Sequence, residues 1–148
     1  MTLLAIRTAA CVVLVLTAVA GCGFIAAGRK SVQKPSTFVL LGHADVALPA
    51  SDRAAIGTTC VAPASVNVGA RTPVKVVDQR GVTIAEGTLG SGVLTRSGNV
   101  TTCAFPFQIP PVPGTSTSYG ISVGGRPTQT FLASQLRQNQ PAVVTITR

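Results

Sequence analysis

Residues 73–89 read PVKVVDQRGVTIAEGTL, and this stretch gives the clearest indication of the fold. Two runs rich in β-branched residues, 73–78 and 82–89, flank the polar segment Asp78-Gln79-Arg80-Gly81. Gly81 can adopt the positive φ that tight turns between antiparallel strands require. The stretch therefore predicts a β-hairpin.

Two longer runs that alternate at period two lie on either side of this hairpin. Residues 37–48 divide into an apolar face and a mixed face. The apolar face holds Phe38, Leu40, Ala44, Val46 and Leu48, and the mixed face holds Val39, Leu41, His43 and Asp45. Residues 100–109 predict a second core strand with Cys103, Phe105, Phe107 and Ile109 turned inward. Pro106 within it predicts an edge position or a bulge, because proline cannot donate to a ladder.

Shorter strands complete the pattern. They lie around Cys60 and at residues 119–123, 127–132 and 142–147, and residues 133–138 predict one helical turn. Seven or eight short strands separated by Gly and Pro over residues 37–148 predict an all-β domain. The expected architecture is a single antiparallel β-sandwich of two sheets.

The amino terminus has the layout of a secretory signal peptide. Arg7 precedes an apolar run at residues 8–19, and small residues follow. Val19-Ala20-Gly21-Cys22 resembles the lipobox of bacterial lipoprotein precursors. The resemblance implies cleavage between Gly21 and Cys22 and acylation of Cys22, palmitate being one such chain. Plain secretion, or an uncleaved membrane helix over residues 8–28, is the alternative.

This resemblance divides the chain into a signal peptide at residues 1–21, a lipidated cysteine and flexible tether at 22–36, and the β domain at 37–148. It places the protein on the extracytoplasmic face of the cell membrane. The tether carries Arg29, Lys30 and Lys34, a cluster expected either to bind anionic lipid or to act as a soluble spacer.

The four cysteines fit the same compartment. Cys11 lies in the signal peptide and Cys22 is the expected acylation site. Cys60 and Cys103 remain, and an exported domain is expected to join them as a disulfide, here linking the two sheets. A metal site is the weaker alternative, since no His or Cys adjoins either residue.

Composition offers little for catalysis. His43 is the one histidine, and the carboxylates are Asp45, Asp52, Asp78 and Glu86. His43 and Asp45 share a strand face and could join a serine, but no G-x-S-x-G motif is present and Gly90-Ser91-Gly92 reads as a hairpin-like loop. We interpret the pair as polar groups on a solvated face, and we expect no cofactor and no metal. The net charge is +8, yet its cations are spaced without interleaved aromatics, so nucleic acid is not an expected partner.

Three segments carry a second resemblance: VKVVDQRGVTIAEGTL, CAFPFQIPPVP and YGISVGGR. They are similar to small exported actinobacterial proteins of poorly defined function, which pair a disulfide with an Ig-like or transthyretin-like sandwich. The resemblance implies a fold and no catalytic residue. The expected function is that of a non-enzymatic, lipid-anchored envelope protein that binds a partner or organises the envelope. Alternatives are a carrier of lipid or another amphiphile, suggested by Val39 and Leu41, and a hydrolase using His43 and Asp45.

Overall fold

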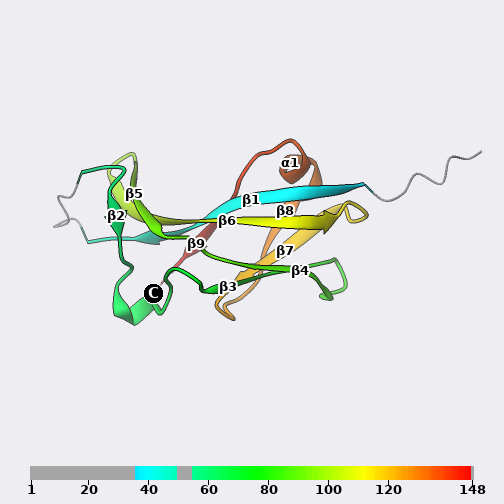
Figure 1. Ribbon diagram of the computed structural model, residues 1–148, viewed down its shortest axis with the longest axis horizontal. Coiled ribbons are helices and arrows are strands. Elements are labelled where there is room, and N and C mark those ends of the chain that lie inside the picture. The colour runs from blue at the N-terminus through cyan, green and yellow to red at the C-terminus, as the bar shows by residue number, and fades with distance from the viewer. Residues whose placement is uncertain (1–35, 50–54, 148) are drawn as a thin grey trace, which may run out of the picture. The chain divides into compact units, whose positions relative to one another are not determined.

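The computed structural model describes residues 36–49 and 55–147 (Figure 1). Two sheets account for most of this part of the chain. The first, sheet A, has the strand order β2-β5-β6-β1-β9, and the second, sheet B, has the order β4-β3-β7-β8. The elements are β1 (Thr37–Ala47), β2 (Thr59–Cys60), η1 (Ala64–Val66), β3 (Pro73–Val77), β4 (Thr83–Thr88), β5 (Gly92–Ser97), β6 (Val100–Pro113), β7 (Ser118–Val123), β8 (Gln129–Leu132), α1 (Ala133–Arg137) and β9 (Ala142–Ile146). The all-β prediction is confirmed in this coarse form.

The strand that sequence reasoning missed is β5. Its first residue, Gly92, ends a Gly-rich stretch that was interpreted as a hairpin-like loop. Gly90 and Ser91 do lie in a connection, but it is not a hairpin, because the chain leaves β4 in sheet B and enters β5 in sheet A through this stretch. The Gly90 N–H donates to the Pro106 carbonyl at 2.7 Å and fixes the crossing point against β6.

The β3–β4 hairpin is confirmed. Val74 pairs with Gly87 and Lys75 with Glu86, and Gly81 adopts a φ of 78° in the turn. Asp78 organises the turn, since its Oδ1 accepts hydrogen bonds from the N–H groups of Arg80 and Val82, each at 2.9 Å. These hydrogen bonds favour the ionised carboxylate and lower the pKa of Asp78.

Sheet A is not wholly antiparallel, which corrects the prediction. The C-terminal strand β9 runs parallel to β1, with Ala44 beside Val144. A parallel pair requires a crossover connection, and α1 lies in the segment that returns from β8 in sheet B to sheet A.

Strands β1 and β6 form the long central pair of sheet A and run side by side in Figure 1. Phe38 and Leu48 of the predicted inward set are partly buried. The others are buried: Leu40, Ala44, Val46, Cys103, Phe105, Phe107 and Ile109. Pro106 does not lie on an edge strand, because β6 is flanked by β5 and β1. The ladder to β5 ends at Ala104, however, so the nitrogen of Pro106 needs no strand partner on that side.

The two sheets meet through a buried aromatic contact. Tyr119 of β7 is fully buried, and its ring lies 5.5 Å from that of Phe38 in β1, measured between centroids. The Tyr119 hydroxyl donates to the Pro113 carbonyl at 2.6 Å. This bond satisfies the buried hydroxyl and ties the end of β6 to sheet B.

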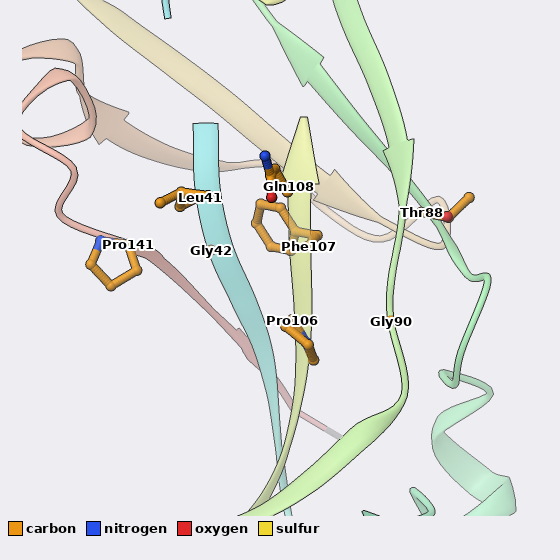
Figure 2. Close-up of a pocket in the computed structure, with 8 residues that line it drawn as sticks. All are labelled: Leu41, Gly42, Thr88, Gly90, Pro106, Phe107, Gln108 and Pro141. Atoms are coloured by element: carbon orange, nitrogen blue, oxygen red, sulfur yellow. The ribbon is translucent and has the colours of Figure 1, made fainter. Parts of the chain in front are cut away.

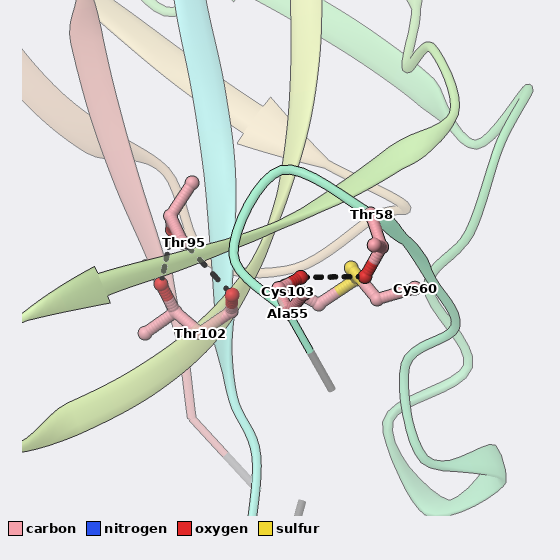
Figure 3. Close-up of a disulfide and its surroundings, with 6 residues drawn as sticks. All are labelled: Ala55, Thr58, Cys60, Thr95, Thr102 and Cys103. Atoms are coloured by element: carbon pink, nitrogen blue, oxygen red, sulfur yellow. Dashed lines mark hydrogen bonds between the residues drawn. A yellow bond between two sulfur atoms is a disulfide. The ribbon is translucent and has the colours of Figure 1, made fainter. Parts of the chain in front are cut away.

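Cys60 and Cys103 form the expected disulfide, with their Cα atoms 5.9 Å apart (Figure 3). The expectation that it links the two sheets is wrong, because β2 and β6 both belong to sheet A. The bridge spans β5 at Gly92. A Cβ atom on Gly92 would lie 2.6 Å from the Cys103 sulfur, so only glycine leaves room for the sulfurs to cross this strand.

Candidate functional site

The solvent side of sheet A carries apolar and polar residues around one pair of ionisable side chains, His43 and Asp45. We call this surface the outer face. It comprises Val93 and Thr95 of β5, Thr102, Ala104, Pro106 and Gln108 of β6, Val39, Leu41, His43 and Asp45 of β1, and Val143 and Thr145 of β9. Val39, Leu41, Val93 and Val143 remain 37–42% exposed. Partly exposed aliphatic side chains on the same face as an ionisable pair make this face a candidate interaction surface.

His43 and Asp45 lie at the centre of the outer face. The His43 Nε2 and Asp45 Oδ1 atoms are 3.6 Å apart, and the side chains keep only 31% and 22% of their exposure. The predicted strand geometry is therefore confirmed, but the face is less solvated than expected. Side chains from the strands on both sides of β1 flank His43 and Asp45 and reduce their exposure. The pattern of β1 alone does not reveal these neighbours.

The register places two rows of side chains across the outer face. His43 lies between Pro106 of β6 and Val143 of β9. Asp45 lies between Ala104 of β6 and Thr145 of β9. Neither cross-strand neighbour of His43 carries a hydroxyl that could act as a nucleophile.

The Asp45 carboxylate has lost part of its solvation and has His43 as its one ionisable neighbour among the described residues. Its partial burial raises its pKa, an effect that His43 opposes. Its Oδ1 is buried and accepts no hydrogen bond from the residues described. The strands β5, β6 and β9 contribute no ionisable residue to the outer face, and the ion pairs Lys75–Glu86 and Arg80–Asp78 belong to sheet B and its β3–β4 turn.

A shallow, open trough adjoins this pair. It has a volume of about 460 Å³, and Figure 2 shows its lining residues. These are Leu41, Gly42, Thr88, Gly90, Pro106, Phe107, Gln108 and Pro141. Leu41 and Pro141 lie on one side of Phe107, and Thr88 and Gly90 lie on the other (Figure 2). The lining is more apolar than polar, with Thr88 and Gln108 as its polar side chains, so the trough could receive an apolar side chain or part of an acyl segment.

Two arginines that the sequence left unexplained are structural. Arg126 donates to the carbonyls of Val66 and Thr147. Arg137 donates to the carbonyls of Gly114 and Ser116, each at 2.7 Å. Both cations satisfy backbone oxygens at the ends of strands and connections, which gives each a structural role.

The residues expected to serve cleavage, lipidation and the basic tether cannot be placed in this structure. Gly21, Cys22, Arg29, Lys30 and Lys34 all lie outside the described residues. Over residues 36–49 and 55–147, no group of three or more His, Cys, Asp or Glu side chains could hold a metal ion. No helix in this same part of the chain is long and apolar enough to cross a membrane.

No protein-family model matches the chain, and neither a curated protein nor a solved structure shows significant similarity to it. Function is therefore inferred from the geometry of the outer face and from the pattern of the amino terminus.

Proposed function

We propose that this chain is a lipid-anchored, non-enzymatic protein of the cell envelope whose β domain binds a partner through the outer face of sheet A. The observation that carries the proposal is the half-exposed apolar face around His43 and Asp45. Acylation of Cys22 and display on the extracytoplasmic side follow from the lipobox-like sequence. The Cys60–Cys103 disulfide supports that side, because such bonds persist in oxidising compartments.

The same face supports a binding role over a hydrolytic one. A serine hydrolase needs its histidine within hydrogen-bond reach of a nucleophile. Pro106 and Val143 occupy the two cross-strand positions beside His43. The cross-strand positions beside His43 therefore offer no nucleophile for a serine-hydrolase mechanism.

We further propose an Ig-like type for the sandwich. In immunoglobulin-type folds, a tyrosine near the start of one strand donates its hydroxyl to a backbone carbonyl a few residues upstream. Tyr119, near the start of β7, makes such a bond to Pro113, six residues upstream.

Anchoring is tested by fractionating cells that express the wild-type chain or the Cys22→Ser variant. The wild-type chain should sediment with membranes and carry acyl mass on Cys22. The variant, lacking the sulfur that accepts the lipid, should lose that mass. A Cys22 of unmodified mass in the membrane-bound wild-type chain would contradict the anchor.

Partner binding is tested with a photo-reactive residue at Val143, on the outer face, in the membrane-associated full chain. Val61, which is 82% exposed, provides the matched control position. Adducts should form from Val143 and not from Val61. Equal labelling from both positions, or none from either, would contradict a specific surface.

A carrier of lipid or another amphiphile is the second candidate, because the trough beside Leu41 has the size and the apolar lining for part of an acyl chain. In the same experiment, adducts of lipid mass at Val143 would favour the carrier. Adducts of protein mass would favour the partner-binding role.

A further inference from the structure

We propose that the outer face of sheet A binds the same face of a second copy of this chain, forming a two-fold symmetric dimer. The two-fold axis would lie in the interface, perpendicular to β1 and level with Ala44. The inference rests on the proposed binding role of this face and names its partner. Self-complementary pairing of one patch with itself is the usual geometry of a homodimer.

The charges on the outer face suit this symmetry. A rotation about the proposed axis makes the two β1 strands antiparallel and places His43 of each copy opposite Asp45 of the other. Each Asp45 has one ion-pair contact, at 3.6 Å, among the described residues, and the strands β5, β6 and β9 add no other ionisable side chain to this face. A second imidazolium from the other copy would compensate a carboxylate that the fold itself leaves partly desolvated.

The same rotation places the row of side chains through His43 of one copy against the row through Asp45 of the other, and the two rows are complementary in shape. Pro106 lies in the row of His43 and is exposed, whereas Ala104 lies in the row of Asp45 and is 8% exposed. The dimer therefore places each projecting Pro106 ring against the small Ala104 of the other copy. On the far side of β1, Val143 lies opposite Thr145, two side chains of similar volume. Face-to-face sheets about 10 Å apart interdigitate in this way.

The size of the face predicts a weak dimer. Four strands spaced about 4.8 Å apart over the whole length of β1 would give roughly 500 Å² in plan, and the face is smaller than this because β9 flanks only residues 42–46 and β5 only residues 100–104. Specific stable interfaces bury about 800 Å² on each partner. Anchoring both copies to one membrane raises their effective concentration, which lets a weak contact form.

A lipid bilayer fits the outer face less well than a second copy does. Seating this face on a bilayer would bury Asp45 against hydrocarbon with no added cation, which is costly. The second copy supplies that cation from its own His43. Lipid contact is therefore the alternative outcome that the test must be able to reveal.

The test uses pairs of full-length chains that carry different affinity tags, co-expressed, chemically cross-linked in the intact membranes and only then extracted in detergent, at about pH 6, within the range in which histidine side chains can be protonated. His43 and Asp45 of β1 are the titratable groups on this face, and β5, β6 and β9 contribute none. Two wild-type copies should co-purify. Two His43→Asp copies, or two Asp45→His copies, should lose most of that co-purification, because like charges then oppose each other.

The decisive sample combines one His43→Asp chain with one Asp45→His chain. Across the proposed axis every carboxylate then faces an imidazolium, so co-purification should return towards the wild-type level. If His43 and Asp45 acted only within their own chain, mixing the two variants would not restore co-purification. Chains carrying Val61→Asp, which adds a carboxylate at another exposed position, should co-purify as wild type does.

Three outcomes would overturn the dimer. They are failure of wild-type copies to co-purify, absence of rescue in the mixed pair when circular dichroism shows both variants folded, and adducts at Val143 that contain lipid or an unrelated protein. Val143→Arg, which leaves both charged residues in place, provides a second disruption and should also abolish co-purification. The acyl mass of Cys22, read in the same sample, shows separately whether the anchoring proposal holds.

Discussion

Gly92 is the residue on which the disulfide depends. The Cys60–Cys103 bridge crosses β5 at this position, and a Cβ atom here would lie 2.6 Å from the Cys103 sulfur and 2.8 Å from a Phe105 ring carbon. We expect Gly92→Ala to lower the free energy of unfolding by about 1–3 kcal/mol through overpacking. Urea unfolding of the oxidised protein measures this change.

Gly69→Ala is the matched control for Gly92→Ala, since a Cβ atom at Gly69 would meet nothing within 4 Å. This control should change the free energy of unfolding by less than about 0.5 kcal/mol. Equal effects of the two substitutions would contradict the steric role of Gly92.

Asp45 should make stability fall as pH rises. Partial burial raises its pKa above the ordinary value of 3.8, so the folded protein holds this proton more tightly than the unfolded chain does. Its contribution to stability is then complete below pH 3.8 and is lost as pH rises through the folded-state pKa. Asn carries no charge to desolvate, so Asp45→Asn should raise the melting temperature at neutral pH.

The advantage of Asp45→Asn should vanish in acid, where both states of the wild-type protein are protonated. Thermal melts across the acid-to-neutral range follow this difference. Glu86→Gln, at an exposed pair in sheet B, should show no such rise. A lower melting temperature for Asp45→Asn at neutral pH would mean that its pairing with His43 outweighs the cost of burial.

Among the elements, β9 is the edge strand of sheet A that the rest of the fold protects. The Gln129 side chain donates to the Thr145 carbonyl at 2.7 Å and accepts from the Thr145 N–H at 3.2 Å. Arg126 donates to the carbonyl of Thr147 just beyond the strand. These side chains occupy main-chain groups of Thr145 and Thr147 to which another strand could bind, which is one way in which edge strands avoid aggregation.

We expect Gln129→Ala to free the Thr145 amide. Loss of a hydrogen bond worth about 1 kcal/mol corresponds to roughly fivefold faster amide exchange. Hydrogen exchange followed by mass spectrometry should show this acceleration in β9, together with a greater tendency to aggregate. Gln140→Ala, at an exposed position just before the strand, should leave exchange in β9 unchanged. Unaltered exchange in the Gln129→Ala chain would contradict the protection.

Element by element, the strands predicted best were those with local signals. The β3–β4 hairpin follows from β-branched runs around a turn that needs Gly81, and all of those signals lie within one stretch of chain. Strand β5 was missed because Gly92 reads as a turn residue when taken alone. Its place in a strand depends on Cys60 and Cys103, which approach it from distant parts of the sequence.

For the whole molecule, the disulfide should make a large contribution to stability. The two cysteines are 43 residues apart, and closing such a loop restricts the unfolded chain by about 4 kcal/mol in the chain-entropy model. The paired change Cys60→Ser with Cys103→Ser should lower the free energy of unfolding by about 2–5 kcal/mol. Chemical unfolding of oxidised, reduced and serine-substituted chains measures this loss.

Reduction of the wild-type protein should reproduce most of the effect of the serine pair. A serine-substituted chain as stable as the oxidised protein would show that the loop is already ordered without the bond. Because β2 pairs with β5 through only Thr59 and Cys60, we expect the loss to be concentrated at this edge of sheet A.

The sequence by itself determined the all-β class, the inward faces of β1 and β6, the β3–β4 turn and the pairing of the two remaining cysteines. Each of these depends on a local period, a turn residue or a count, which are properties of the chain alone. It also placed His43 and Asp45 on one strand face, since two residues along a strand return to the same side.

Only the tertiary structure decided the surroundings of that pair. The parallel docking of β9 brings Val143 and Thr145 to one side of β1, and β6 brings Ala104 and Pro106 to the other. Strand order and register arise from contacts between segments far apart in the chain, so no single strand pattern encodes them. These contacts convert a solvated polar pair into charges on a half-buried apolar face, and they place both halves of the disulfide in one sheet.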